Sequence, residues 1–559
     1  MESCSWSDHG LTGPPSQFIG CETVKSALER WKSARILLTD TIRSYTSACS
    51  ILRVACATVI HQSSRSVVVE ESLAMVDSEL DSLASEEKNL HDTRVLLSMM
   101  RNNSTALAPI NRLPPEILAH VLVLSGSYCA RKNQRSLKFH DLAAVCVYWR
   151  RVAMNATDLW AHVDIGPGTP SGLTDLMLAR AKNSSLHVHV FVPRDFNFKP
   201  IPVEEADKLM TTLALCIHRV WRLDIESNEE GLSDFITRVL HLWLECGNVD
   251  VFRTLAIYHP RMSYPVGYGG INGGIAISKS NNAERMLHSF NRLHLESVDF
   301  GWNSSVYYGL VDLRLIFHES SGWDGDFSVT TAQLAATLSA SPELAILKLK
   351  GLSVHRADNP QTRILMKHLS VLNLVGMESG SLTALLSVID LSTTLDHISL
   401  GVSVRSERLD EFETFLARSK ITTLYFKETK RIHPPESRLL PLRHCLTHVR
   451  TLIIDGVGIF DNHFVETEPY SPQPLSFHSF KVILFNCGVN RKSLKDLVSN
   501  YGIQELRLEY CWIHPGHDSA AMHYEKDLLE NAYPQLQCNV SGIDSTSRLA
   551  CRTMFDDRD

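Results

Sequence analysis

The hexads LAILKL at residues 344–349 and LSVLNL at residues 369–374 share the pattern apolar-x-x-apolar-x-apolar. The pattern also starts at Val220, Phe252, Phe290, Leu310, Leu395, Ile421, Val449, Phe480 and Ile503. Because 44% of the residues are apolar, a single hexad carries little information, and the spacing supplies the evidence. The fourth residues of five successive hexads lie 25, 26, 26 and 28 residues apart: Leu347, Leu372, Ile398, Leu424 and Leu452. This spacing predicts a strand that recurs in a repeated unit.

Helix-like segments lie between these predicted strands. In GSLTALLSVID (380–390) and RLDEFETFLARS (408–419) the apolar residues fall on one helical face. A strand and a covering helix that recur every roughly 20 to 29 residues resemble a leucine-rich repeat. The last hexad extends the pattern, with Cys511 at the turn position and Ile513 after it. The resemblance covers about residues 185–515, is irregular before residue 340, and implies an α/β solenoid with a parallel sheet.

In such a solenoid, alternate strand residues face away from the core and form a concave surface. Their mixed charges suit a protein ligand better than a polyphosphate. The candidates for binding a target protein are Arg222, Asp224, Arg314, Lys348, Lys350, Asn373, Arg507 and Glu509. For any one of them, the alternative is a solvated strand position without a binding role. His187 and His189 have no Cys or carboxylate at metal-ligand spacing, so we expect ordinary strand positions for them.

A second motif, INRLPPEILAHVLVLSG, occupies residues 110–126. Pro114, Pro115 and Glu116 predict a helix start, because proline suits the first turn of a helix. An apolar face follows, formed by Ile117, Leu118, Val121 and Leu122. A second amphipathic helix is predicted in HDLAAVCVYWRRVAMN, with one face formed by Leu142, Val145, Cys146, Trp149 and Val152. Two such short helices are near the lower limit of independent stability and need a partner to cover them.

The segments LPPEIL (113–118), VCVYWRRVA (145–153) and DLW (158–160) resemble an F-box, in the form common in large fungal F-box-like families. The resemblance covers residues 108–165 and implies a three-helix domain that docks a Skp-type adaptor, and through it a cullin–RING ubiquitin ligase. The connector at 125–141 is longer and more basic than the compact one of the family. The implied adaptor-binding residues are Leu113, Pro114, Ile117, Leu118, Val121, Val145, Cys146, Trp149 and Trp160.

Residues 21–104 predict two long helices, because apolar residues recur at alternating steps of three and four from Val24 to Val59 and again from Leu73 to Leu97. The helices either cover each other as a hairpin, which we favour, or self-associate as a coiled coil. Polar Glu87 and Arg94 interrupt the second seam. We expect disorder at residues 1–20, and a C-terminal cap with a disordered tail at 516–559. The predicted fold is thus an α N-terminal region, comprising the hairpin and the F-box, followed by the solenoid.

Composition narrows the functional classes. A net charge of -7 over 559 residues gives no reason to expect a nucleic-acid partner. The 13 cysteines contain no Cys-x-x-Cys, which indicates reduced thiols in the cytoplasm or nucleus. We find no signal peptide, no apolar run that could span a membrane, and no catalytic, metal-binding or cofactor-binding motif. The resemblance to an F-box then implies a non-enzymatic substrate receptor of a Skp–cullin–F-box type ubiquitin ligase. The alternatives are a leucine-rich-repeat interaction scaffold with a degenerate F-box and a cryptic enzyme.

Overall fold

The computed structural model divides the chain into two compact units, Met1–Ala108 and Pro109–Asp559. It describes residues 24–60, 67–103, 109–128, 142–166, 169–192, 203–227, 234–258, 280–317, 328–357, 363–391, 398–403, 410–427, 448–456, 458–459, 480–513, 526 and 529–541. The predicted disordered terminus (1–20), most of the connector at 125–141 and most of the predicted cap and tail (516–559) lie outside these residues.

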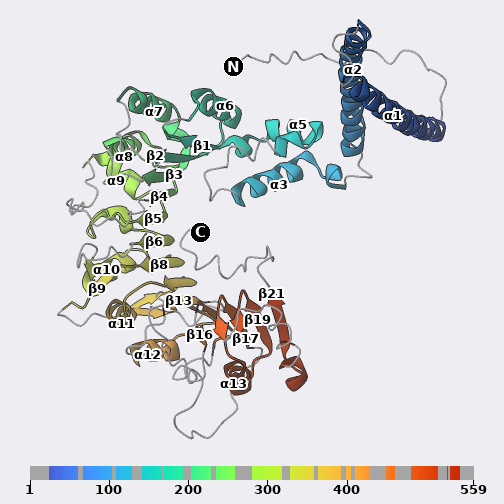
Figure 1. Cartoon of the computed structure of the whole chain (residues 1–559). Coiled ribbons are helices and arrows are strands. Elements are labelled where there is room, and N and C mark those ends of the chain that lie inside the picture. The colour runs from blue at the N-terminus through green and yellow to red at the C-terminus, as the bar shows by residue number, and fades with distance from the viewer. Residues whose placement is uncertain are drawn as a thin grey trace. The chain divides into compact units, whose positions relative to one another are not determined.

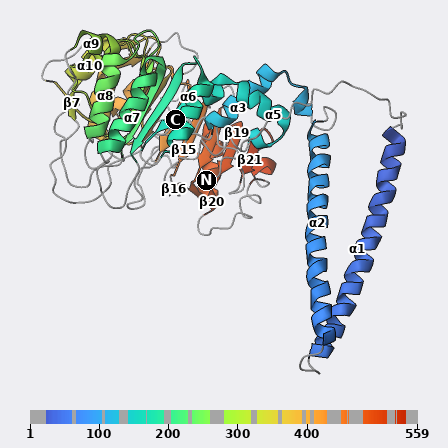
Figure 2. The same cartoon turned by 90° about the horizontal axis from the view of Figure 1, so that it is seen from above.

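The first unit consists of two helices, α1 (Val24–Ile60) and α2 (Val67–Asn103). They run in opposite directions and converge toward the ends that residues 61–66 join (Figure 2). The Tyr45 hydroxyl donates a hydrogen bond to Glu79 Oε1 at 2.7 Å, which links the two helices. None of the described side chains in this unit is buried. The predicted helices are confirmed, but the hairpin leaves the apolar seams of both helices largely exposed to solvent.

The second unit begins with short helical elements and continues as an α/β solenoid (Figure 1). The elements before the sheet are η1 (Pro109–Arg112), α3 (Pro115–Tyr128), α5 (Val147–Asn155) and η2 (Thr157–Trp160). The helical elements between strands are α6 (Ser171–Ala181), α7 (Val203–Cys216), η3 (Ile217–Arg219), α8 (Asp234–Cys246), α9 (Asn281–Leu287), η4 (Ser305–Tyr307), α10 (Thr331–Ser339), α11 (Ser379–Val388), α12 (Asp410–Arg418) and α13 (Arg491–Tyr501).

Fourteen parallel strands of the described chain form one sheet, in which spatial order follows chain order. They are β1 (His162–Ile165), β2 (Leu186–Val192), β3 (Val220–Ser227), β4 (Thr254–Tyr258), β5 (Arg292–Glu296), β6 (Asp312–Ile316), β8 (Ile346–Lys350), β11 (Val371–Leu374), β13 (Ser399–Ser403), β14 (Thr423–Lys427), β15 (Thr451–Asp455), β17 (Lys481–Phe485), β19 (Glu505–Glu509) and β21 (Gln537–Ser541). The predicted limits of the array, 185 and 515, were too narrow. The strand β1 lies inside the predicted F-box segment, and β21 lies inside the predicted cap.

Short parallel pairings accompany the main sheet. They join β7 (Ser328–Thr330) to β9 (Ser353–His355), β10 (Ile364–Met366) to β12 (Ile389–Leu391), and β16 (Gly458–Ile459) to β18 (Gly488–Val489) and β20 (Trp512–Ile513). The pair β18 and β20 repeats at the same distance after β17 and β19. The repeated unit therefore includes a second, shorter strand.

The strand register corrects two of the hexad assignments. Leu372 pairs with Leu400, two residues after the predicted Ile398, and a shift of two keeps the side chain on the same face. In FKVILF, Leu452 pairs with Val482 and not with Ile483. That shift of one residue moves Ile483 to the opposite face of the sheet.

The unit length varies along the solenoid. The register partners Leu293 and Leu313 lie 20 residues apart in the sequence, whereas the register partners Leu255 and Leu293 lie 38 residues apart. The predicted irregularity before residue 340 is therefore confirmed.

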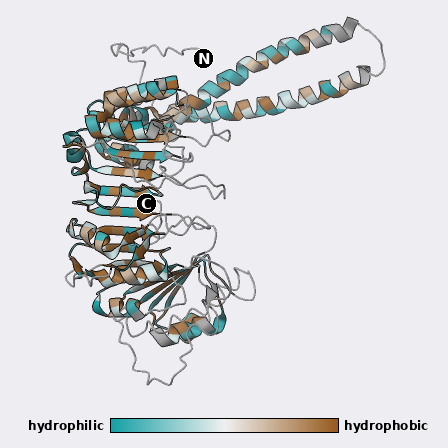
Figure 3. Cartoon of the chain, turned by 90° about the vertical axis from the view of Figure 1, so that its left-hand side faces the viewer, coloured by the Kyte–Doolittle hydropathy of each residue, from teal (hydrophilic) through white to brown (hydrophobic). Residues whose placement is uncertain are grey.

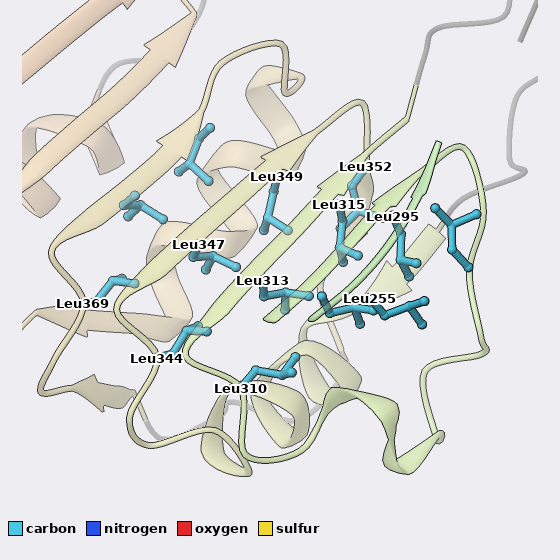
Figure 4. Close-up of a cluster of buried hydrophobic side chains, with 14 of the residues drawn as sticks. Leu255, Leu295, Leu310, Leu313, Leu315, Leu344, Leu347, Leu349, Leu352 and Leu369 are labelled. Carbon is cyan, nitrogen blue, oxygen red and sulfur yellow. The ribbon is translucent and has the colours of Figure 1, made fainter. Parts of the chain in front are cut away.

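One face of the sheet packs against the helices and forms the core. Strand leucines on this face gather in a continuous layer (Figure 4), and they belong to the same buried cluster as helix residues such as Leu334 and Leu385. Hydropathy alternates along the strands (Figure 3), as expected when only one strand face is buried against helices.

A left-handed backbone conformation ends six of the fourteen strands at the same register position. It occurs at Ser297, Gly351, Gly376, Gly456, Asn486 and Tyr510, each four residues after the second residue of its strand. At Gly351 a β-carbon would lie 2.0 Å from the carbonyl oxygen of Phe317, so only glycine fits there. These six repeats thus share one turn geometry although their lengths differ.

Candidate binding surfaces

The pair of helices α3 and α5 is held together by side-chain hydrogen bonds. The Cys146 sulfur caps the N-terminus of α5 by accepting from Trp149 N–H at 3.4 Å. The Trp149 indole Nε1 donates to Asn111 Oδ1 at 3.1 Å, and the Tyr148 hydroxyl donates to the Leu113 carbonyl at 2.9 Å. These bonds fasten α5 to the segment that leads into α3.

Two of the predicted adaptor-binding residues lie in the core. Leu118 is completely buried, and Trp160 is buried as well. The Trp160 Nε1 donates to the Ala153 carbonyl at 2.7 Å, while the Arg180 guanidinium lies 4.3 Å from the centre of the Trp160 ring. These two side chains therefore stabilise the helices against the first repeat and are not available at the surface.

Other predicted residues remain at the surface of this region. Ile117 is 52% exposed and Val145 is 47% exposed, and Pro114 is also exposed. The remaining four are half-buried: Leu113, Val121, Cys146 and Trp149. Exposed apolar side chains that the motif did not indicate are Leu124, Val147 and Met154. Leu124 could have been found, because it follows Ile117 by seven residues and shares its helical face.

The opposite, concave face of the sheet carries a network of histidines and carboxylates on β1 to β3. His187 Nε2 lies 2.8 Å from Asp224 Oδ2, and His189 Nδ1 lies 2.9 Å from Asp164 Oδ1. The Nδ1 atoms of His162 and His187 lie 3.0 Å apart. Since a carboxylate only accepts, His187 donates to Asp224 through Nε2, and its Nδ1 accepts from His162 when His187 is neutral.

Burial and pairing set the charges of this network. Burial lowers the pKa of His187 to about 4. The hydrogen bond to Asp224 opposes this shift, whereas the charges of His162 and Arg222 add to it. Burial also opposes the charge of His189, but hydrogen bonds to Asp164 and Glu226 outweigh it and raise its pKa to about 9. At neutral pH His187 is therefore neutral and His189 is cationic.

The network's carboxylates are fixed in their charged form. Burial would raise the pKa of Asp224, but His187 and Arg222 hold it well below its usual range. The Arg222 guanidinium donates to both carboxylate oxygens of Asp224, at 2.8 and 3.0 Å. His162 and His189 likewise keep the pKa of Asp164 low against its burial. The contact between His187 and Asp224 could not be predicted from sequence spacing, because the strand register brings together two residues that are 37 positions apart.

The structure places the eight predicted target-binding residues on the concave face, but not all are accessible there. Asp224, Lys348, Asn373 and Glu509 are buried. Arg222 is one-third exposed, and Arg314 is held by two hydrogen bonds to Asp312 at 2.9 Å. Lys350 and Arg507 are half-buried, and Arg507 donates to Glu505 at 2.6 Å.

Further along the concave face, polar residues give way to a buried apolar cluster. It consists of residues in strands or directly after one: Val371, Val375, Tyr425, Ile453 and Ile483, with Ile346 packed against it. The Tyr425 hydroxyl donates to Asp455 Oδ2 at 2.6 Å beside it. Each of these residues alternates with core-facing residues. Their place on the concave face was not predicted, because the apolar hexad residues were all expected to face one core. This part of the concave face is thus apolar and buried.

The described residues contain no group of three or more His, Cys, Asp or Glu side chains that could hold a metal ion. Among the described helices, none combines the length and the apolar character needed to cross a bilayer. Comparison of the sequence with models of known protein families gives no match, and comparison with curated proteins gives none either.

Proposed function

We propose that the chain is the substrate-receptor subunit of a Skp–cullin–F-box type ubiquitin ligase, in which α3 and α5 dock the adaptor. The observation that carries this proposal is a set of exposed apolar side chains on, or just before, two short helices whose other faces are already buried: Ile117, Leu124, Val145, Val147 and Met154. Apolar side chains that a folded unit leaves at its surface mark an interaction site. They lie in or beside the segments that resemble an F-box.

The concave face is the proposed surface for a target protein. Partly exposed side chains of both charges lie toward each end of the sheet. They are Arg222 and Glu226 on β3 and Arg507 on β19. Pre-ordered charged groups of this kind select a partner by complementary charge. The interpretation of the array as leucine-rich repeats is supported by the shared turn and by Cys487 and Cys511, whose thiols donate to carbonyls of the preceding repeats at 3.3 Å.

In this proposal the chain contributes position and no chemistry of its own. The ε-amine of a target lysine, held nearby by the solenoid, would attack the thioester that joins ubiquitin to a ligase-bound carrier enzyme. An amide bond forms and the cysteine thiol of the carrier enzyme leaves, so proximity accelerates transfer. No cofactor is required for that role. The chain would act in the cytoplasm or nucleus, where such ligases operate.

The test is co-purification of the full chain with the Skp-type adaptor of the same organism. We expect a one-to-one complex that Ile117→Asp and Val145→Asp each abolish, because a carboxylate on the contact surface must be desolvated. Leu215→Asp, which alters an exposed leucine of α7, is the matched control and should leave the complex intact. A chain that never binds the adaptor would instead be a leucine-rich-repeat scaffold with a degenerate F-box.

A further inference from the structure

The helices α1 and α2 expose a long row of large apolar side chains to solvent. Seam residues at alternating steps of three and four are 39% to 57% exposed: Leu28, Trp31, Leu38, Ile42, Leu52, Leu80, Leu83, Leu90 and Leu97. An apolar seam with an average step of 3.5 residues is stable when another helix covers it. Because a hairpin of two helices covers only one side of each seam, a further partner is needed.

The two helices also have opposite charges. From Val24 to Ile60, α1 contains six Lys or Arg and two Asp or Glu, a net charge of +4. From Val67 to Asn103, α2 contains three Lys or Arg and eight Asp or Glu, a net charge of -5. An α1 helix is therefore attracted to an α2 helix, whereas two α1 helices, or two α2 helices, repel each other.

We propose that the partner is a second copy of this chain, and that two hairpins pack into a four-helix bundle with α1 of each against α2 of the other. A two-fold axis makes both new contacts identical, so complementary charge at one contact means complementary charge at both. A bundle with α1 against α1 would place like charges together. The outer positions stay polar or exposed, as they are in the single hairpin.

The available surface is large enough for a stable dimer. Each helix has 37 residues, which corresponds to a length of about 55 Å. Two helices of this length, each about 10 Å wide, present about 1,000 Å² on one side, more than the roughly 800 Å² per partner of a standard interface. This inference does not depend on adaptor docking, because it uses only residues of the first unit.

If the proposed function also holds, a dimer would join two receptors in one particle. A target with two recognition sites would then gain affinity through the higher effective concentration of the second solenoid. Dimer formation itself can be measured without adaptor or target, so failure of one proposal is distinguishable from failure of the other.

The test is the solution mass of the full chain by sedimentation equilibrium. We expect twice the 62.7 kDa of one chain, and 62.7 kDa for the double variant Ile42→Asp with Leu83→Asp, which places charge on both seams. The control is Leu37→Asp with Leu96→Asp, at more exposed positions off the seams, which should remain dimeric. An unchanged melting temperature of the solenoid will show that the second unit of the seam variant is folded. A monomeric full chain, or a dimeric seam variant, would overturn the proposal.

Salt distinguishes the two possible pairings. With α1 against α2 of the partner, screening weakens the attraction, so the dissociation constant should rise several-fold between about 50 mM and about 500 mM salt. With α1 against α1, screening relieves repulsion and the dissociation constant should fall, which would refute the proposed arrangement.

Discussion

The N-terminal helices and the solenoid are both built from periodic apolar residues, yet they use them differently. In the solenoid each repeat buries its leucines against its own helix and its neighbours, and residues such as Leu347 are completely buried. In α1 and α2 the apolar residues are equally periodic, but all described side chains remain exposed or half-buried. A repeat of strand and helix supplies both layers of a core within one chain, whereas a helical seam supplies only one.

The largest expected effect tests this difference directly. Leu347→Ala removes a completely buried side chain and should lower the free energy of unfolding of the solenoid by about 2–5 kcal/mol. The same substitution at Leu37, which is 70% exposed, should change it by less than about 0.5 kcal/mol. Urea denaturation followed by circular dichroism measures both. Equal losses would show that burial does not separate the two regions as described.

A second prediction concerns the shared turn of the solenoid. Gly351→Ala should destabilise the solenoid by about 3 kcal/mol, because a β-carbon there meets the Phe317 carbonyl and φ is +64°. Gly309 also has a positive φ, of +69°, but open space around it. Gly309→Ala should therefore cost only about 1 kcal/mol. If both variants melt at the same temperature, the close approach at Gly351 is not what requires glycine.

A smaller effect on the free energy of unfolding is expected from a buried histidine of the solenoid. Among the described residues of the helical unit, no histidine is buried. Burial and Arg314 lower the pKa of His294 to about 3, so the folded state resists protonation. The folded pKa is below that of the unfolded chain, so stability falls as pH drops from about 6.5 toward 3. By pH 5 this loss amounts to about 2 kcal/mol.

His294→Phe should remove this part of the pH dependence, since phenylalanine keeps the ring beside Tyr258. Unfolding free energies at pH 7 and pH 5 give the measurement. His91→Phe, at an exposed position of α2, is the control for replacing an imidazole by a phenyl ring outside the solenoid core. If the His294→Phe variant loses as much stability between pH 7 and pH 5 as the parent protein, His294 is not the source of this pH dependence.

The sequence predicted those parts of the fold that depend on local periodicity. Both long helices, the parallel sheet and the strands in the eleven hexads follow from spacing alone. The strand β1 was missed because its segment was assigned to the F-box, although WAHVDI from Trp160 fits the hexad. The segment of β21, QLQCNV, was assigned to the cap because Gln535 stands at the first apolar position of the hexad. Local pattern thus identifies repeats but not the ends of the array.

The candidate sites were less predictable, because they depend on register between strands. The bond between His187 and Asp224 requires knowing which residues of β2 and β3 lie side by side, and the lengths of the repeats there are irregular. For Ile483, a shift of one residue decided which face it occupies. The burial of Leu118 likewise depends on packing against α5 and η2, which the motif does not specify.

The in-order sheet has a mechanical consequence. Each strand bonds only to the strands before and after it in the chain, so tension along the solenoid loads one ladder of hydrogen bonds at a time. The protein should therefore extend under load in a series of small steps, each releasing one repeat. Since repeats range from 20 to 38 residues, the lengths of successive steps would map the irregular repeats along the chain.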